Sequence, residues 1–181
     1  MICLNKQTTM RNLFSTVVVA ASLALSLTSC LKDDEHFVDF AGAGYVAEIP
    51  YTANRSILQT DSLSASTATS VFPLDINIAS PNPPTQNIDI AVMVDQAALT
   101  TYNTGRTIKY TLLPSSAYQL TPAVTVNAGS RIGTVNITFQ HSQVPKIGGP
   151  YALPITIQTV PSNVTISANY RTQIIAVPLK K

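Results

Sequence analysis

The sequence feature that most constrains the fold is the alternation of apolar and polar residues in several short stretches. In residues 71–78, Phe72, Leu74 and Ile76 share one face while Asp75 and Asn77 occupy the other. Successive side chains of a β-strand point to opposite faces of its sheet, so this pattern predicts half-buried strands. The other stretches of this kind are 88–94, 135–139 and 151–158.

Proline and glycine separate these stretches throughout the chain. Twelve prolines and seven glycines favour short strands and turns over long helices. We predict an all-β antiparallel β-sandwich of about seven or eight strands, with one short helix in residues 96–102 and a last strand in 171–179. We expect 71–78 and 88–94 to pair as a hairpin, and Pro154 to mark an edge strand or a bulge.

The first 29 residues have the pattern of a secretory signal peptide. Lys6 and Arg11 precede an apolar run over 13–27, which ends in small residues. The run is short for a membrane-spanning helix, so that alternative is the weaker one. Residues 27–30 (LTSC) resemble the bacterial lipobox, which implies a lipid on Cys30, although an ordinary signal peptide followed by an incidental cysteine would have the same pattern.

The residues after Cys30 are charged, and they bear on localisation. Lys32, Asp33, Asp34 and Glu35 resemble the surface-export signal of Bacteroidetes lipoproteins, and such a run would also serve as a solvated tether. We therefore expect a lipidated tether over 30–42, a single domain over 43–181, and an outer-membrane protein that faces the cell exterior.

Removal of the leader also changes the charge balance. The chain has 11 basic residues, and loss of Lys6 and Arg11 leaves nine, equal to the nine acidic ones. No basic patch indicates nucleic acid. Cys3 lies in the leader and Cys30 would carry lipid, so no disulfide is expected within one chain.

The chain shows no clear catalytic or metal-binding pattern. His36 and His141 lack a metal-ligand spacing, and we interpret both as surface residues. Asp75, Asp89 and Asp95 invite comparison with the paired carboxylates of glycosidases, but outward positions on strands explain them more simply. We predict a protein that is not an enzyme and holds no cofactor.

Seven tyrosines divide into two groups by their surroundings. Three flank apolar strand residues and should pack in the core or at sheet corners: Tyr110, Tyr118 and Tyr151. The other four are less constrained and are the candidate glycan contacts: Tyr45, Tyr51, Tyr102 and Tyr170.

Three pieces, in this order, resemble a Bacteroidetes domain of unknown function, DUF1735, found at the N-terminus of chitinase-like (family 18) endoglycosidases. They are residues 110–114 (YTLLP) with Tyr118, then 124–130 (VTVNAGS), then 151–155 (YALPI). The resemblance spans roughly 43–178 and implies an immunoglobulin-like sandwich with a role near extracellular glycans. It assigns no binding residues, and because the chain stops at Lys181 we expect no glycosidase barrel.

Two functions from different classes remain open. The first is a surface lipoprotein that binds extracellular glycan and assists its uptake; the second is a structural or adhesive module that docks onto an outer-membrane protein. Residues 61–63 (DSL) also match the O-glycosylation triplet of Bacteroidetes exported proteins, with Ser62 as the acceptor.

Overall fold

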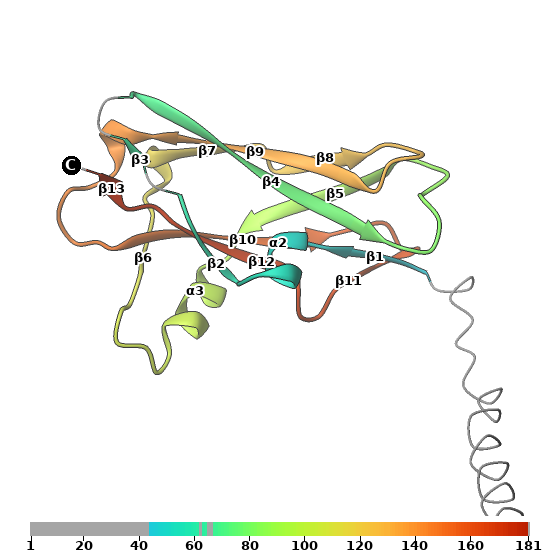
Figure 1. The fold of residues 1–181 in the computed structure, drawn as a ribbon, viewed down its shortest axis with the longest axis horizontal. Helices are drawn as coiled ribbons and strands as arrows, with labels where there is room; N and C mark the ends of the chain where they lie inside the picture. Colours follow the sequence, from blue (N-terminus) through green and yellow to red (C-terminus); the bar gives the residue numbers. More distant parts are fainter. Residues whose placement is uncertain (1–43, 62, 65–66, 181) are drawn as a thin grey trace, which may run out of the picture. The chain divides into compact units, whose positions relative to one another are not determined.

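The alternating stretches form the strands of two facing sheets, as Figure 1 shows. The computed structural model describes residues 44–61, 63–64 and 67–180. The predicted anchor at Cys30, the run from Lys32 to Glu35, and Ser62 lie outside the described residues and stay predictions.

The first sheet has five strands in the order β11-β1-β4-β9-β7. Their bounds are Val164–Ile166 (β11), Tyr45–Glu48 (β1), Thr69–Ala79 (β4), Ile132–Gln140 (β9) and Tyr118–Leu120 (β7). The β4–β9 ladder is antiparallel and runs from Thr69↔Gln140 to Asn77↔Ile132.

The second sheet has six strands in the order β2-β12-β10-β5-β8, with β6 also paired to β10. Their bounds are Leu58–Thr60 (β2), Thr172–Ala176 (β12), Tyr151–Thr159 (β10), Ile88–Val94 (β5), Ala123–Val126 (β8) and Thr111–Leu112 (β6). A separate pair joins β3 (Leu63–Ser64) to β13 (Leu179–Lys180).

Short helices complete the described chain. They are α2 (Pro50–Asn54), α3 (Gln96–Asn103) and the 3-10 turns η3 (Ser115–Ala117) and η4 (His141–Gln143). The helix predicted over 96–102 is confirmed as α3. Asp95 caps its N-terminus by accepting a hydrogen bond from the Ala98 N–H at 3.0 Å.

The main core lies between the two sheets. It is formed by the inward residues of both, among them Leu74, Ile76, Ile137, Phe139 and Ile155, which are all at most 2% exposed. Burial of each such side chain contributes about 1.5–3 kcal/mol. Since the described part of the chain contains no cysteine, this packing supplies the stability that a disulfide would otherwise add.

The sheets approach closely at Gly133 on β9. A Cβ placed there would lie 3.0 Å from the Cγ2 atoms of both Val124 and Val126 on β8. Glycine is therefore needed for contact between the layers.

A smaller core lies on the outer face of the six-stranded sheet, where α3 packs. Leu99 of α3 contacts Ala152 of β10 and Ile174 of β12, which are all buried. Strand β10 is consequently buried on both faces from Ala152 to Ile157, although its sequence alternates like that of a half-buried strand.

The predicted hairpin of 71–78 and 88–94 is wrong. β4 pairs with β1 and β9 in one sheet, while β5 pairs with β8 and β10 in the other. Alternation specifies which face of a strand is buried, and both strands do bury that face in the same core. The proline-rich segment 80–87 between them reverses the chain and carries it from one sheet to the other, instead of joining neighbouring strands of one sheet (Figure 1).

The edge position expected for Pro154 is also wrong, because β10 lies between β12 and β5. On the side that Pro154 faces, β6 pairs with Tyr151 and Ala152, and β5 begins its pairing at Ile155. Pro154 therefore lies between the residues that pair with β6 and those that pair with β5, so its missing N–H interrupts neither ladder. Its carbonyl accepts a hydrogen bond from the Asp95 N–H at 3.1 Å.

Other differences are local. The last strand ends at Ala176 and a separate short strand begins at Leu179, with Pro178 between them. The main ladders are antiparallel as predicted, but short parallel pairs are added by β2, β6 and β11.

Candidate functional site

Helix α2 is held against the six-stranded sheet by a buried glutamine. Thr52 donates from its hydroxyl to the Thr172 carbonyl at 2.9 Å and to Oε1 of Gln173 at 2.8 Å. Gln173 is fully buried, and its amide nitrogen donates to the Ile57 carbonyl at 2.6 Å. These bonds fix the start and end of the segment from α2 to β2.

A groove of about 350 Å³ lies beside this segment. Its lining comes from α2, the start of β2 and the middle of β4: Pro50, Tyr51, Asn54, Arg55, Gln59, Pro73, Leu74 and Asp75. We call it the α2 groove. Its volume falls in the range of pockets that hold small molecules, about 300–1,000 Å³.

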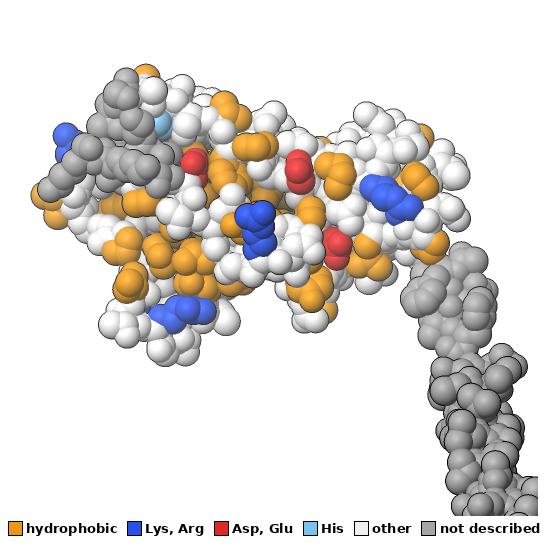
Figure 2. All heavy atoms as spheres, in the orientation of Figure 1, with side chains coloured by type: hydrophobic (Ala, Val, Ile, Leu, Met, Phe, Trp, Pro, Cys, Tyr) orange, Lys and Arg blue, Asp and Glu red, His pale blue; other side chains and the backbone are white. Residues whose placement is uncertain are grey.

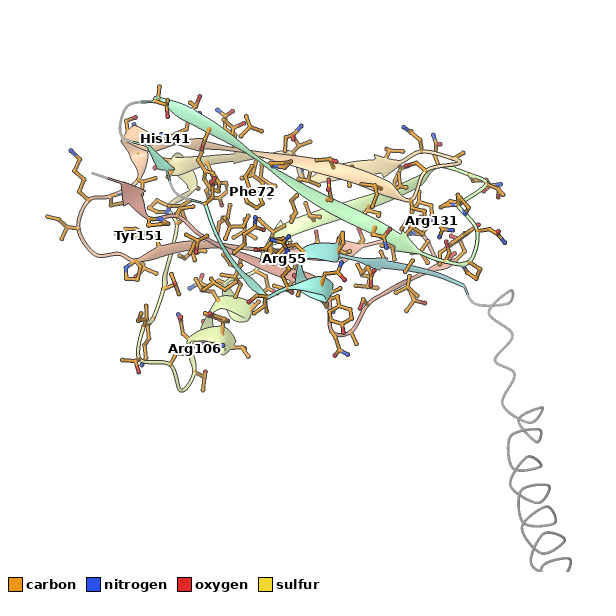
Figure 3. The ribbon with its side chains drawn as sticks, viewed as in Figure 1. Arg55, Phe72, Arg106, Arg131, His141 and Tyr151 are labelled. Atoms are coloured by element: carbon orange, nitrogen blue, oxygen red, sulfur yellow. The ribbon has the colours of Figure 1, made fainter. Side chains whose placement is uncertain are left out.

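The α2 groove combines an aromatic ring with hydrogen-bonding groups of both kinds. The Arg55 guanidinium carbon lies 5.6 Å from the centre of the Tyr51 ring, within cation–π range, and in the described part of the chain it makes no hydrogen bond or ion pair. Figure 3 shows Arg55 beside α2. Arginine supplies donors, Asp75 supplies acceptors, and Asn54 and Gln59 supply both.

Each of these groups is suited to a polyhydroxylated ligand. Sugar hydroxyls both donate and accept hydrogen bonds, and the apolar face of a sugar ring packs on an aromatic ring. One cation and one anion line the groove, so it has no strong net charge. Figure 2 shows isolated side chains of both signs on this face, separated by hydrophobic and neutral ones.

The four tyrosines predicted as glycan contacts do not come together. Tyr51 lines the α2 groove and Tyr45 lines a smaller pocket. Tyr102 lies on α3, where the Arg106 guanidinium carbon is 4.0 Å from its ring centre. Tyr170 is 39% exposed, and its carbonyl accepts from the Ile49 N–H at 2.7 Å, next to α2.

The tyrosines predicted to be structural pack as expected. Tyr118 and Tyr151 lie against the main core and Tyr110 against the smaller one. The Tyr151 hydroxyl donates to the Ile147 carbonyl at 2.8 Å. Burial raises the pKa of Tyr118.

The three aspartates compared with the paired carboxylates of glycosidases each have a separate structural role. Asp75 accepts from Thr134 across the five-stranded sheet, and Asp89 accepts from Thr125 across the six-stranded sheet, each at 2.6 Å. Asp95 is not on a solvated sheet face as predicted, because it caps α3 and also accepts from Thr156 at 3.2 Å. These are structural hydrogen bonds.

His141 is not a surface residue as predicted. It is 6% exposed, and its Nε2 lies 2.9 Å from the Ser70 hydroxyl while Nδ1 lies 3.2 Å from the Thr67 hydroxyl. Burial raises the pKa of nearby Asp61, and the charge of His141 partly opposes that shift. Among the described residues no three His, Cys, Asp or Glu side chains group as metal ligands, and no helix is long and apolar enough to cross a membrane.

The sequence analysis missed Asn54, Arg55 and Gln59. They lie in a stretch of mixed polar and apolar residues without periodicity, and only Pro50, which favours the first turn of a helix, signals that α2 begins there. Nothing local in the sequence connects this stretch with Asp75 on β4.

Solved structures share this fold. A multidomain Bacteroides ovatus protein that includes DUF1735 is 21% identical, with a TM-score of 0.58 over 75% of this chain and 45% of its own. EndoBT-3987 of Bacteroides thetaiotaomicron, solved with a Man5GlcNAc product, is 21% identical, with a TM-score of 0.57 over 74% and 30%. A candidate carbohydrate-binding protein of Bacteroides ovatus is 15% identical, with a TM-score of 0.58 over 73% and 36%.

This chain thus spans less than half the length of each of those three proteins. None of the curated proteins compared with it matches. A protein-family model described as an N-terminal domain matches residues 41–178. The chain therefore belongs to the DUF1735 family of N-terminal domains.

Proposed function

We propose that this protein is a non-catalytic cell-surface lipoprotein that binds extracellular glycan in the α2 groove, as an accessory to the uptake of polysaccharide or glycoprotein glycan. The observation that carries the proposal is the groove itself, where the Tyr51 ring, the unpaired Arg55 guanidinium and the Asp75 carboxylate line one concave surface. The candidate carbohydrate-binding protein and EndoBT-3987, which share the fold, support this ligand class.

The anchor is part of the same proposal. A lipid on Cys30 would hold the protein at the outer membrane, and the run from Lys32 to Glu35 would direct it to the exterior. Several acyl chains retain a protein where one is marginal, since each buried CH₂ contributes about 0.8 kcal/mol. Replacement of Cys30 by alanine should abolish incorporation of labelled palmitate, and wild-type cells should expose the protein to added protease.

Glycan binding is tested with the protein lacking its first 30 residues on an array of host and plant glycans. A reproducible hit is expected, and Arg55→Ala should weaken it about tenfold, the effect of losing a hydrogen bond to a charged group. Arg106→Ala is the matched control, because Arg106 also lies over a tyrosine ring, that of Tyr102, but is in the loop after α3 and does not line the groove. Equal losses in both variants, or no hit across the array, would contradict the proposal.

A protein partner is the second candidate function, and exposed apolar residues favour it. Ile147 is 88% exposed and Ile108 is 63% exposed, and their loops are joined by a bond from the Thr111 hydroxyl to the Gly148 carbonyl at 3.2 Å. Cross-linking on whole cells that captures a stoichiometric outer-membrane protein, together with an empty glycan array, would favour this function.

A further inference from the structure

A second pocket lies at the end of the sandwich where β1 begins. Its volume is about 130 Å³, and its polar lining comes from three segments: Tyr45 at the start of β1, Thr85, Gln86 and Asn87 before β5, and Asn163 before β11. We call it the Tyr45 pocket. It shares no lining residue with the α2 groove.

The segment before β5 is fixed in place by hydrogen bonds. Arg131 on the adjacent turn donates to the Ser80 carbonyl and, at 2.8 Å, to the Pro81 carbonyl. Pro84 is buried, and its carbonyl accepts from the Gly129 N–H at 2.8 Å. Figure 3 shows Arg131 at this end of the molecule. Because the segment is already ordered, a ligand loses little binding free energy to its ordering.

The polar groups of the Tyr45 pocket are neutral and largely unused. The carbonyl oxygen of Asn87 accepts from the Ala128 N–H at 2.9 Å. In the part of the chain that the structure describes, the side-chain amides of Gln86 and Asn163 and the Tyr45 hydroxyl make no hydrogen bond. No charged residue lines the pocket.

We propose that the Tyr45 pocket is a second glycan subsite that takes one uncharged sugar unit. Amides offer a donor and an acceptor together, which matches the paired hydroxyls of a sugar ring, and the half-buried Tyr45 ring supplies an apolar surface. The volume equals that of about four water molecules at about 30 Å³ each, so it admits part of a single ring and not a long glycan. With no charged residue in its lining, the pocket offers no ion pair to uronic acids or sulfated sugars, which favours an uncharged unit.

This inference rests on the proposed function, since both sites would bind parts of a glycan. Pro50 of the α2 groove is five residue steps from Tyr45 along extended chain, which places these two residues roughly 17 Å apart. Two weak subsites on one folded domain bind separate units of the same glycan more tightly than either binds alone, because the second contact becomes intramolecular.

The test follows the side-chain amide NMR signals of the full ¹⁵N-labelled chain during titration with three neutral sugars: mannose, galactose and N-acetylglucosamine. The signals of Gln86 and Asn163 should shift at millimolar sugar. Gln86→Ala/Asn163→Ala should weaken binding measured at the Asn87 amide about tenfold, since two hydrogen bonds are lost. Gln119→Ala/Gln143→Ala is the control, because it removes two exposed amides far from the pocket.

The amide signals of Asn54 and Gln59 report on the α2 groove in the same titration, so the two proposals fail separately. Shifts at Asn54 and Gln59 alone would overturn the second subsite and leave the proposed function intact. Shifts at Gln86 and Asn163 alone would support the subsite and count against the groove. An absence of shifts at both places would overturn both proposals. Equal effects of the two double variants on sugar binding would overturn the second subsite.

Discussion

Replacement of Gln173 by leucine should loosen the segment that forms the α2 groove without touching the groove lining. The glutamine is fully buried, and it joins β12 to α2 through the Thr52 hydroxyl and to the residue before β2 through the Ile57 carbonyl. Leucine has a similar volume but no hydrogen-bonding group, so the variant tests the hydrogen bonds and not the packing.

The expected loss follows from the partners that remain. A buried polar group without any partner costs about 1–3 kcal/mol, and two such losses would remove a large share of a typical stability of about 5–15 kcal/mol. However, the Ile57 carbonyl also accepts from the Ile174 N–H at 2.7 Å, and the Thr52 hydroxyl also donates to the Thr172 carbonyl at 2.9 Å. The net cost should therefore be nearer the loss of two ordinary bonds, about 2 kcal/mol.

Urea unfolding and amide hydrogen exchange check this prediction together. The unfolding free energy of Gln173→Leu should fall by about 2 kcal/mol, and exchange should rise most over residues 52–58. Gln119→Leu, at an exposed position, is the control and should change neither quantity. An unchanged free energy, or a uniform rise in exchange over all strands, would refute the assignment of Gln173 as the anchor of α2.

Three further changes test other parts of the structure. Gly133→Val should lower the unfolding free energy, measured by urea titration, by about 1–3 kcal/mol, because the added side chain forces apart two sheets in contact. Gly44→Val is the control and should have no effect, because no atom lies within 4 Å of the Cβ position there. Asp95→Ala removes the cap of α3 and should cost about 1 kcal/mol, measured by thermal unfolding followed by circular dichroism. Burial raises the pKa of Asp61 above its ordinary value of 3.8, against the opposing charge of His141, so the folded state holds this proton more tightly than the unfolded state. The unfolding free energy of the wild type relative to Asp61→Asn should be greatest below pH 3.8 and should fall as the pH rises through the folded-state pKa of Asp61. If this difference in unfolding free energy does not vary with pH, Asp61 does not titrate in this way.

The sequence predicts the buried face of each long strand well, because alternation with a period of two is a local property. Ile88 and Ile90 on β5, and Val135 and Ile137 on β9, are buried as their positions require. The choice of strand partner is not local, which is why the hairpin prediction failed although both of its strands exist. The same limit explains β10, since only the packing of α3 on its outer face makes it fully buried.

The candidate site was predictable only in part. Tyr45 and Tyr51 stand out because aromatic residues are few, and each does line a concave surface. Arg55 gave no signal, because one cation in a polar stretch usually belongs to a solvated surface. Its importance depends on the fold, which places β4 and Asp75 beside α2.

The residues that position the α2 groove are distinct from those that line it, and this separates two ways of losing binding. Arg55 is exposed in the groove, so its loss should weaken binding and leave folding unchanged. Gln173 lies beneath α2 and touches no groove surface, so its loss should weaken binding only because α2 is less ordered before the ligand arrives. The two effects act through different steps, and the double variant should therefore show their sum in binding free energy but only the Gln173 contribution in unfolding free energy. If instead the double variant binds no more weakly than Arg55→Ala alone, the order of α2 does not matter for the ligand, and the groove does not depend on the anchor that the structure gives it.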